Sequence, residues 1–296
     1  MKYALIAAIE SDNKCINSDL NIVNIQRKFE SEAVICFQNW RQNGGWLKDI
    51  PIYVMCPTKN VISFDTAQQL HNLGVTYIEE YHPITEQFNS GFLNVPYVGK
   101  VFEDTLDVDV TIKIDLDMNL IQPLPQALVE AGVTVCGQYD DYCTKLQRTL
   151  EPGWCNPFDT GFVISPTRLK FYTKWWDGVW EILNGAHDPD WELVKQQTGE
   201  YYLEEYVVDK LYHHDNTVLQ PVQKYQIGEW YTPVSAFTDE ELQSVYFWHE
   251  HLLHDPKYNK IREKVEYFNR MSKIKRHQDE ISIIRRWWVY RHTPIQ

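Results

Sequence analysis

Two aspartates that follow a buried strand are the residues in this sequence whose type and spacing most clearly indicate chemistry. The stretch 111–119 reads Thr-Ile-Lys-Ile-Asp-Leu-Asp-Met-Asn, so an apolar strand runs directly into Asp115-Leu116-Asp117. In extended backbone, residues two apart point to the same side and lie about 6.5–7 Å apart. Two carboxylates at this spacing can share one divalent cation, and such hard oxygen ligands suit Mn²⁺ or Mg²⁺, which also bind diphosphates. The pair is a candidate metal site, although an Asp-x-Asp tripeptide also occurs at strand ends that bind nothing.

The elements around this pair alternate between strand and helix. Apolar runs and helical periodicity predict strands at 3–9, 51–57, 75–78, 108–114, 133–136 and 162–164, and helices at 24–40, 65–73, 97–107 and 167–184. This alternation is typical of an α/β domain with a mostly parallel sheet and helices on both faces. Ligands of such open sheets bind outside the carboxyl ends of the strands, which is where the two aspartates are expected.

The composition is that of a folded, acidic protein. The 296 residues carry a formal net charge of −13, and 44% of them are apolar and 14% aromatic, which is enough to build a large core. The length suits one large α/β domain or two small ones. The acidity argues against a general nucleic-acid coat protein, so we expect no nucleic-acid partner.

A change in charge separates residues 257–296 from the rest of the chain. This segment has 11 Lys and Arg against four acids, a charge of +7, which leaves −20 for residues 1–256. We therefore divide the chain into a main domain, 1–256, and a basic helical extension, 257–296. The extension either folds back on the acidic body, which we favour, or meets an anionic membrane or substrate.

The sequence predicts neither a membrane span nor a disulfide framework. No apolar run approaches the roughly 18 residues that a spanning helix needs. The run at 3–9 is followed at once by Glu10 and Asp12, which favours a buried strand over a signal peptide. The six cysteines form no C-x-x-C, as is typical of reduced thiols. We expect a cytoplasmic protein, with peripheral membrane contact through the basic C-terminus as a further option.

The Asp-x-Asp stretch resembles the motif with which GT-A fold glycosyltransferases bind a nucleotide sugar through a divalent metal. Its continuation to Pro123-Leu124 is similar to glycosyltransferase family 8 and its relatives. Three other segments resemble this superfamily in the same order: Tyr97-Val98-Gly99-Lys100, Phe158-Asp159-Thr160-Gly161-Phe162 and Leu203-Glu204-Glu205. Asp159 stands where asparagine is usual, and the two glutamates stand where an Asp-Gln pair is usual.

The resemblance implies a metal-dependent transferase with a GT-A, Rossmann-like mixed sheet. It would move a hexose from a nucleotide sugar, with UDP-glucose or UDP-galactose as the expected donor and Mn²⁺ or Mg²⁺ as the cofactor. The acceptor would be a glycan, a lipid or a small molecule, and the family likeness favours retention of configuration. Residues 1–120 would then form the nucleotide-binding half and residues 121–256 the sugar and acceptor half.

The resemblance also implies roles for individual residues. Asp115 and Asp117 would ligate the metal together with His249 from a distant loop, since neutral imidazole suits Mn²⁺. The nucleotide-sugar site would be lined by residues from the end of the first strand, the helix before the motif, the motif itself, the 158–162 segment and the late loop. These residues are Ala7, Ala8, Ile9, Glu10, Lys100, Asp115, Leu116, Thr160, Gly161 and Lys257.

Glu204 and Glu205 are candidate catalytic residues at the start of a predicted helix, and Asp159 is a third. A carboxylate at the sugar can act as a base, or can stabilise the anomeric carbon from the rear face of the donor. Acids in a first helical turn are also favourable on electrostatic grounds alone. The sequence leaves these roles open.

Two other functions remain open on the sequence. A phosphohydrolase of the haloacid dehalogenase type also places Asp-x-Asp after a buried strand, but usually after the first strand rather than near residue 115. A non-catalytic carbohydrate-binding protein of the same fold is the other alternative. Nucleotide binding and phosphomonoester hydrolysis separate the three.

Overall fold

The computed structural model describes residues 1–9, 22–58, 61–80, 82, 91–137, 158–198, 203–214, 219–222, 226–228, 237–249, 266–275 and 278. Within this part of the chain, seven strands form the main sheet in the order β3-β2-β1-β4-β7-β6-β8. They are β1 (Tyr3–Ala8), β2 (Ile52–Cys56), β3 (Val75–Glu79), β4 (Val110–Ile114), β6 (Val133–Gly137), β7 (Phe158–Pro166) and β8 (Leu219–Val222).

The main sheet is mixed and mostly parallel. Strand β7 pairs antiparallel with both β4 and β6, whereas the other neighbouring strands run parallel. The chain adds β2 and β3 on one side of β1 and then returns to add β4 on the other. The strand order therefore reverses between β1 and β4, and the carboxyl ends of these two strands form the crevice in which such sheets bind ligands. We call this edge of the sheet the carboxyl edge.

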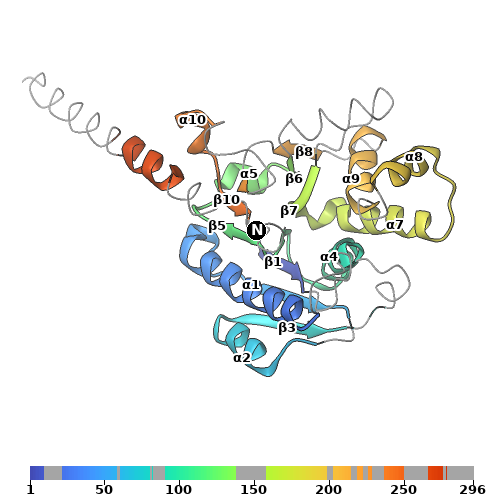
Figure 1. Ribbon diagram of the computed structural model, residues 1–296, viewed down its shortest axis with the longest axis horizontal. Helices are drawn as coiled ribbons and strands as arrows, with labels where there is room; N and C mark the ends of the chain where they lie inside the picture. The colour runs from blue at the N-terminus through green and yellow to red at the C-terminus, as the bar shows by residue number, and fades with distance from the viewer. Residues whose placement is uncertain are drawn as a thin grey trace, which may run out of the picture.

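Helices cover both faces of this sheet, as the strand and helix alternation predicts (Figure 1). On one face, α1 (Ile22–Asn43), α2 (Phe64–Asn72) and the short α5 (Gln126–Glu130) pack on alternate residues of β1, β2 and β4. On the other face lie α4 (Asn94–Thr105), α7 (Phe171–Leu183), α8 (Pro189–Thr198) and α9 (Leu203–His214). The α/β fold expected from the sequence is confirmed, and its central strands are buried on both sides.

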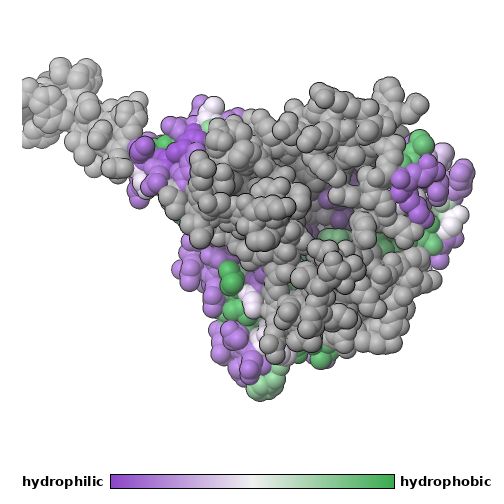
Figure 2. Space-filling model, viewed as in Figure 1, coloured by the Kyte–Doolittle hydropathy of each residue, from purple (hydrophilic) through white to green (hydrophobic). Residues whose placement is uncertain are grey.

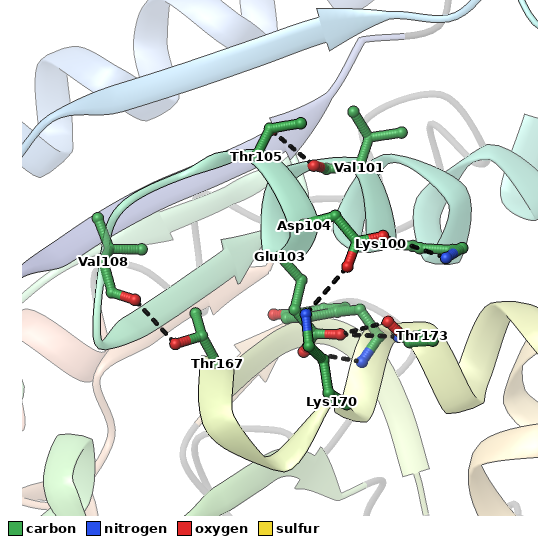
Figure 3. A network of polar contacts seen from close by, with 10 residues as sticks. Lys100, Val101, Glu103, Asp104, Thr105, Val108, Thr167, Lys170 and Thr173 are labelled. Atoms are coloured by element: carbon green, nitrogen blue, oxygen red, sulfur yellow. Dashed lines mark hydrogen bonds and ion pairs between the residues drawn. The ribbon is translucent and has the colours of Figure 1, made fainter.

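A polar network joins α4 to the start of α7 at the amino end of β4 (Figure 3). The Glu103 carboxylate accepts hydrogen bonds from the backbone N–H and the hydroxyl of Thr173, at 3.0 and 2.7 Å. Asp104 forms ion pairs with Lys100 at 3.1 Å and with Lys170 at 2.9 Å. These contacts fix the helical layer at the edge of the sheet opposite the aspartate pair.

A second, three-stranded sheet was not foreseen from the sequence. It has the order β5-β10-β9 and consists of β5 (Met118–Leu120), β9 (Gln226–Gly228) and β10 (Phe247–His249). Each of these strands has only three residues, which is too short for a periodic pattern to reveal. The sheet brings the late segment 247–249 against the residues that follow the Asp-x-Asp motif.

The structure describes one piece of the basic extension, a helix at residues 266–275. Tyr267 is buried against Phe237, Leu242 and Trp248, near the short helix α10 (Asp239–Leu242). Arg270 forms an ion pair with Asp239 at 2.7 Å. The outer surface of this helix is largely hydrophilic (Figure 2). In the described residues the extension therefore packs on the body of the protein, the arrangement that we favoured.

No helix among the described residues is long and apolar enough to cross a membrane. The remaining short elements are the 3-10 helices η1 (Gly45–Leu47), η2 (Gly91–Leu93) and η3 (Thr167–Leu169). Cys36 and Cys56 are buried free thiols.

Candidate functional site

The two aspartates of the motif lie at the carboxyl edge, but the chain turns between them instead of continuing extended. The Asp115 N–H donates to the Gly161 carbonyl of β7 at 2.7 Å, which extends the β4–β7 pairing by one residue. The Met118 N–H then donates to the Asp115 carbonyl at 3.1 Å and closes a turn. This turn sends the chain from β4 into β5. The two carboxylates consequently have different neighbours.

Asp117 lies beside an imidazole that comes from far along the chain. In the antiparallel pairing of β5 and β10, His249 stands opposite Met118, the residue after Asp117. The Nε2 atom of His249 lies 3.2 Å from Oδ1 of Asp117. The imidazole is buried, with 2% of its side chain exposed, whereas 20% of the Asp117 side chain is exposed. The pairing of β5 with β10 therefore places His249 next to Asp117.

Asp115 contacts a lysine that the sequence analysis did not single out. The Lys113 ammonium donates to Oδ1 of Asp115 at 2.5 Å and to the Thr160 carbonyl at 2.6 Å. Only 3% of the Lys113 side chain is exposed, against 35% of the Asp115 side chain. A lysine inside an otherwise apolar central strand is unusual, because buried lysine is rare unless it is paired. That single charge in the run Val-Thr-Ile-Lys-Ile was the available signal.

The hydrogen bonds continue from β7 to the first turn of α9. The Thr160 hydroxyl donates to the Glu204 carboxylate, with distances of 3.2 and 3.1 Å to its two oxygens. The Trp175 indole N–H donates to the Glu204 backbone carbonyl at 2.8 Å and ties α7 to the same point. Glu204 is buried, and its neighbour Glu205 is half-buried. Asp115, Lys113, Thr160 and Glu204 thus form one chain of polar contacts across β4, β7 and α9.

Burial raises the pKa of two groups in this region, the Asp115 carboxyl and the Cys36 thiol. Burial is the largest influence on Asp115 and raises its pKa, while the Lys113 charge acts in the opposite direction and the Asp117 charge adds to the rise. Burial also raises the pKa of the Cys36 thiol, with further contributions from Asp117 and Asp115. A bound cation would relieve the repulsion between the two aspartates.

Helix α1 holds the strand that follows the motif. The side-chain amide of Asn39 donates to Oδ1 of Asn119 at 2.8 Å, and that of Asn43 donates to the Leu120 carbonyl at 2.7 Å. Both contacts fix β5, and so they fix the turn that carries Asp117. Neither asparagine has a sequence signature, because each acts through a partner some 80 residues away.

The residues expected to line a nucleotide pocket lie partly in the core. The side chains of Ala7 and Ile9 are fully buried, and the Ile9 N–H donates to the Met55 carbonyl at 2.9 Å. Ala8 is half-buried on the face covered by α4, and Leu116 packs in the core on the opposite face. The ends of β1 and β4 therefore present mainly backbone atoms at this position, beside the small side chains of Ala7 and Ala8.

The structure describes four of the remaining predicted residues, which lie on β7 and α4. Thr160 and Gly161 lie on β7 next to Asp115, and Asp159 pairs with Cys136 in the β6–β7 ladder. The Lys100 ammonium pairs with Asp104 in the half of α4 that leads to the amino end of β4 (Figure 3), and its contact with the donor stays a prediction. Glu10 and Lys257 lie outside the described residues.

Two of the three predicted metal ligands lie close enough together to bind one divalent cation. Asp117 and His249 provide adjacent oxygen and nitrogen atoms, of the types that Mn²⁺ accepts. Among the described residues, however, no group of three or more His, Cys, Asp and Glu side chains is arranged to hold a metal ion. The Oδ1 atom of Asp115 accepts a hydrogen bond from Lys113. Metal ligation by Asp115 together with the other two stays a prediction.

Comparisons with known proteins find glycosyltransferases among the structural neighbours. Mouse xyloside xylosyltransferase 1, in its apo form, has a TM-score of 0.47 and 9% sequence identity, over 85% of this chain and 98% of that one. The glycosyltransferase GlyE of Streptococcus pneumoniae TIGR4 has a TM-score of 0.44 and 13% identity, over 76% of this chain and 47% of that one. No protein-family model matches the sequence, and no curated protein matches it either.

Proposed function

We propose that this protein is a glycosyltransferase that transfers a hexose from a nucleotide sugar, with UDP-glucose or UDP-galactose as donor. The observation that carries the proposal is the contact between Asp117 and His249 beside Asp115, at the carboxyl edge between β1 and β4. Carboxylate and imidazole groups at such a reversal of strand order are placed where open α/β sheets bind phosphate-bearing ligands. The net charge of −13 repels a diphosphate, so a cationic centre at this point would favour its binding.

Asp117 and His249 are the residues proposed to hold Mn²⁺ or Mg²⁺, with Asp115 as a further ligand. When bound, the ion supplies the positive charge that stabilises a departing nucleoside diphosphate. The side chains of the protein orient the donor around it: small residues at the end of β1 leave room for a base, and Thr160 and Gly161 border the sugar. Lys100 stays a proposed donor contact that would require its ammonium to leave Asp104.

The candidate catalytic residues are Glu204, Glu205 and Asp159. Glu204 is fixed by the Thr160 hydroxyl, and its carboxylate is buried, so we assign it to holding the geometry of β7 against α9. Glu205 is more exposed, and we assign it to the sugar or its anomeric carbon. A stabilising carboxylate at this carbon suits transfer with retention, which we propose by analogy with the family resemblance.

Calorimetric titration of the full chain with UDP, with and without Mn²⁺, tests the proposal. UDP binding that requires or is strengthened by Mn²⁺ supports it, and a panel of sugar nucleotides screened for hydrolysis by mass spectrometry then names the donor. Hydrolysis of a generic phosphomonoester without nucleotide binding would instead identify a phosphohydrolase. Binding of free sugars without turnover of any sugar nucleotide would identify a carbohydrate-binding protein.

A further inference from the structure

The two aspartates of the motif have different partners, because among the described residues Lys113 forms an ion pair with Asp115 only. Asp115 is held by an ammonium from its own strand, and Asp117 faces the imidazole of His249. A turn separates the two carboxylates, so each of them has a different partner. The site therefore carries one fixed positive charge before any cation binds.

The position of Lys113 is not explained by packing alone. Its neighbours in the sheet are Ile6 of β1 and Val163 of β7, both fully buried and apolar, so an apolar side chain would suit the strand. Burying a lysine costs free energy that is recovered only when its charge is paired and hydrogen-bonded. Here the Asp115 carboxylate and the Thr160 carbonyl provide that compensation.

We propose that Lys113 is a positioning residue that competes with a divalent cation for the Asp115 carboxylate. The ion is then held chiefly by Asp117 and His249, and the contact with Lys113 weakens the contribution of Asp115. The inference rests on the proposed function in one respect, which is that a divalent ion binds at Asp117 and His249. Lys113 itself is too deeply buried to contact the donor directly.

Two electrostatic effects of the Lys113 ammonium cause this competition. The Oδ1 atom of Asp115 accepts a hydrogen bond from the Lys113 ammonium at 2.5 Å, so part of the negative charge of this carboxylate is already neutralised and the carboxylate binds a metal ion more weakly. The Lys113 charge also repels an incoming cation, and this repulsion is strong in a partly buried site, where the effective dielectric constant is low. Removing the charge should therefore strengthen Asp115 as a metal ligand and lower the electrostatic cost of metal binding.

The test is the affinity of the Lys113→Met variant for Mn²⁺ alone, measured from the electron paramagnetic resonance signal of free Mn²⁺. Methionine keeps much of the length of the lysine side chain and removes its charge. We expect the variant to bind Mn²⁺ at least about tenfold more tightly than the wild type, since tenfold corresponds to 1.4 kcal/mol. Mn²⁺ should also raise the melting temperature of the variant more than that of the wild type.

Lys210→Met is the matched control. Lys210 forms an ion pair with the buried Asp188 at 2.6 Å in the α8–α9 layer, so its loss also removes a lysine charge from a carboxylate. It should leave Mn²⁺ affinity within about twofold of the wild type, because long-range effects of single charges are screened. A similar gain in both variants would show a general effect of net charge and would overturn the inference.

A second comparison applies if Lys113→Met does not fold. In the wild-type background, Asp115→Asn should weaken Mn²⁺ binding by less than about threefold and Asp117→Asn by more than about tenfold, as 1.4 kcal/mol is tenfold. Equal losses in the two variants would overturn the inference. If the wild type binds Mn²⁺ and UDP while Lys113→Met binds Mn²⁺ no more tightly, the inference fails and the proposed function stands. If neither protein binds Mn²⁺, the metal part of the proposed function fails with it.

Discussion

Asp117 and His249 meet because β5 and β10 pair in one register, with Met118 opposite His249 and Leu120 opposite Phe247. Phe247 is fully buried and packs on Phe162 of β7, with ring centroids 4.4 Å apart. The strand that carries the imidazole is thereby anchored in the core of the main sheet. The geometry of the Asp–His pair is consequently set by the strand pairing and the core packing of the fold.

Asp117→Ala should abolish metal-dependent UDP binding and leave the fold intact. The side chain is half-buried in a turn at a strand end, and its loss removes the contact with His249. We expect the UDP affinity in the presence of Mn²⁺ to fall at least about tenfold, or 1.4 kcal/mol, by calorimetry. Asp107→Ala, an exposed aspartate paired with Lys2 away from the site, is the control and should bind UDP normally. Undiminished turnover in Asp117→Ala would reject the site.

Glu205→Ala should lower turnover more than donor affinity. A carboxylate that acts on the anomeric carbon stabilises the transition state, so its loss appears in kcat with little change in the KM for the sugar nucleotide. Steady-state kinetics with the donor found in the screen measure both. Glu204→Gln is the comparison, because it should mainly reduce stability through the contact with Thr160. Equal losses of kcat and donor affinity in Glu205→Ala would assign that residue to binding.

Much of the fold could be predicted from the sequence, because the strands of the main sheet are long enough to show periodicity. The apolar runs at β1, β2 and β4 and the helical spacing of α1 identify the layers without any structure. The antiparallel direction of β7 could not be predicted, since strand direction depends on where the connecting segments cross the sheet. The three-residue strands β5, β9 and β10 carry no pattern at all.

The candidate site shows a similar division. The Asp-x-Asp motif stands out because its residues are adjacent in sequence, and the histidine candidate came from the family resemblance. The pairing of Asp115 with Lys113 and of Asp117 with His249 depends on the turn at Leu116, which tertiary contacts impose. The link from Thr160 to Glu204 likewise joins β7 to α9 through contacts between distant segments.

Gly99→Ala should destabilise the protein through overpacking between α4 and α7. A Cβ atom at Gly99 would lie 2.3 Å from Cδ1 of Tyr172, whose hydroxyl donates to the Val163 carbonyl at 3.2 Å. The Tyr172 ring is fully buried and its hydroxyl is hydrogen-bonded, so the ring has no room to move away. We therefore expect the free energy of unfolding, measured by chemical denaturation, to fall by about 1–3 kcal/mol. Lys100→Ala on the same helix is the control, with a loss of at most about 0.5 kcal/mol. Equal stability of Gly99→Ala and the wild type would show that the helices can separate.

The control variant also addresses the donor role of Lys100. In the proposed site the Lys100 ammonium leaves Asp104 to contact the donor, so Lys100→Ala should weaken UDP binding about tenfold, equal to 1.4 kcal/mol, by calorimetry. A UDP affinity within about twofold of the wild type, the change expected for a screened charge, would show that the lysine does not contact the donor.

The stability of the α8–α9 layer should fall in acid because of Asp188. Burial opposes ionisation of this carboxyl, but hydrogen bonds from Lys210, Tyr206 and the Trp191 N–H outweigh it and lower the pKa of Asp188. A carboxyl whose pKa is lower in the folded than in the unfolded chain stabilises the fold above the unfolded pKa, about 3.9 for aspartate. That stabilisation is lost as the pH falls through the lower, folded value. Asp188→Asn should therefore cost about 1–3 kcal/mol at neutral pH and show a smaller further loss between about pH 5 and pH 3.

Denaturant unfolding at several pH values measures this difference. Asp177→Asn, an exposed position on α7, should follow the wild-type pH dependence and is the control. If Asp188→Asn loses as much stability as the wild type between pH 5 and pH 3, other carboxyls carry the acid sensitivity. The contact of Asp188 with the Tyr206 hydroxyl at 2.8 Å would then hold α8 against α9 without contributing to the pH dependence.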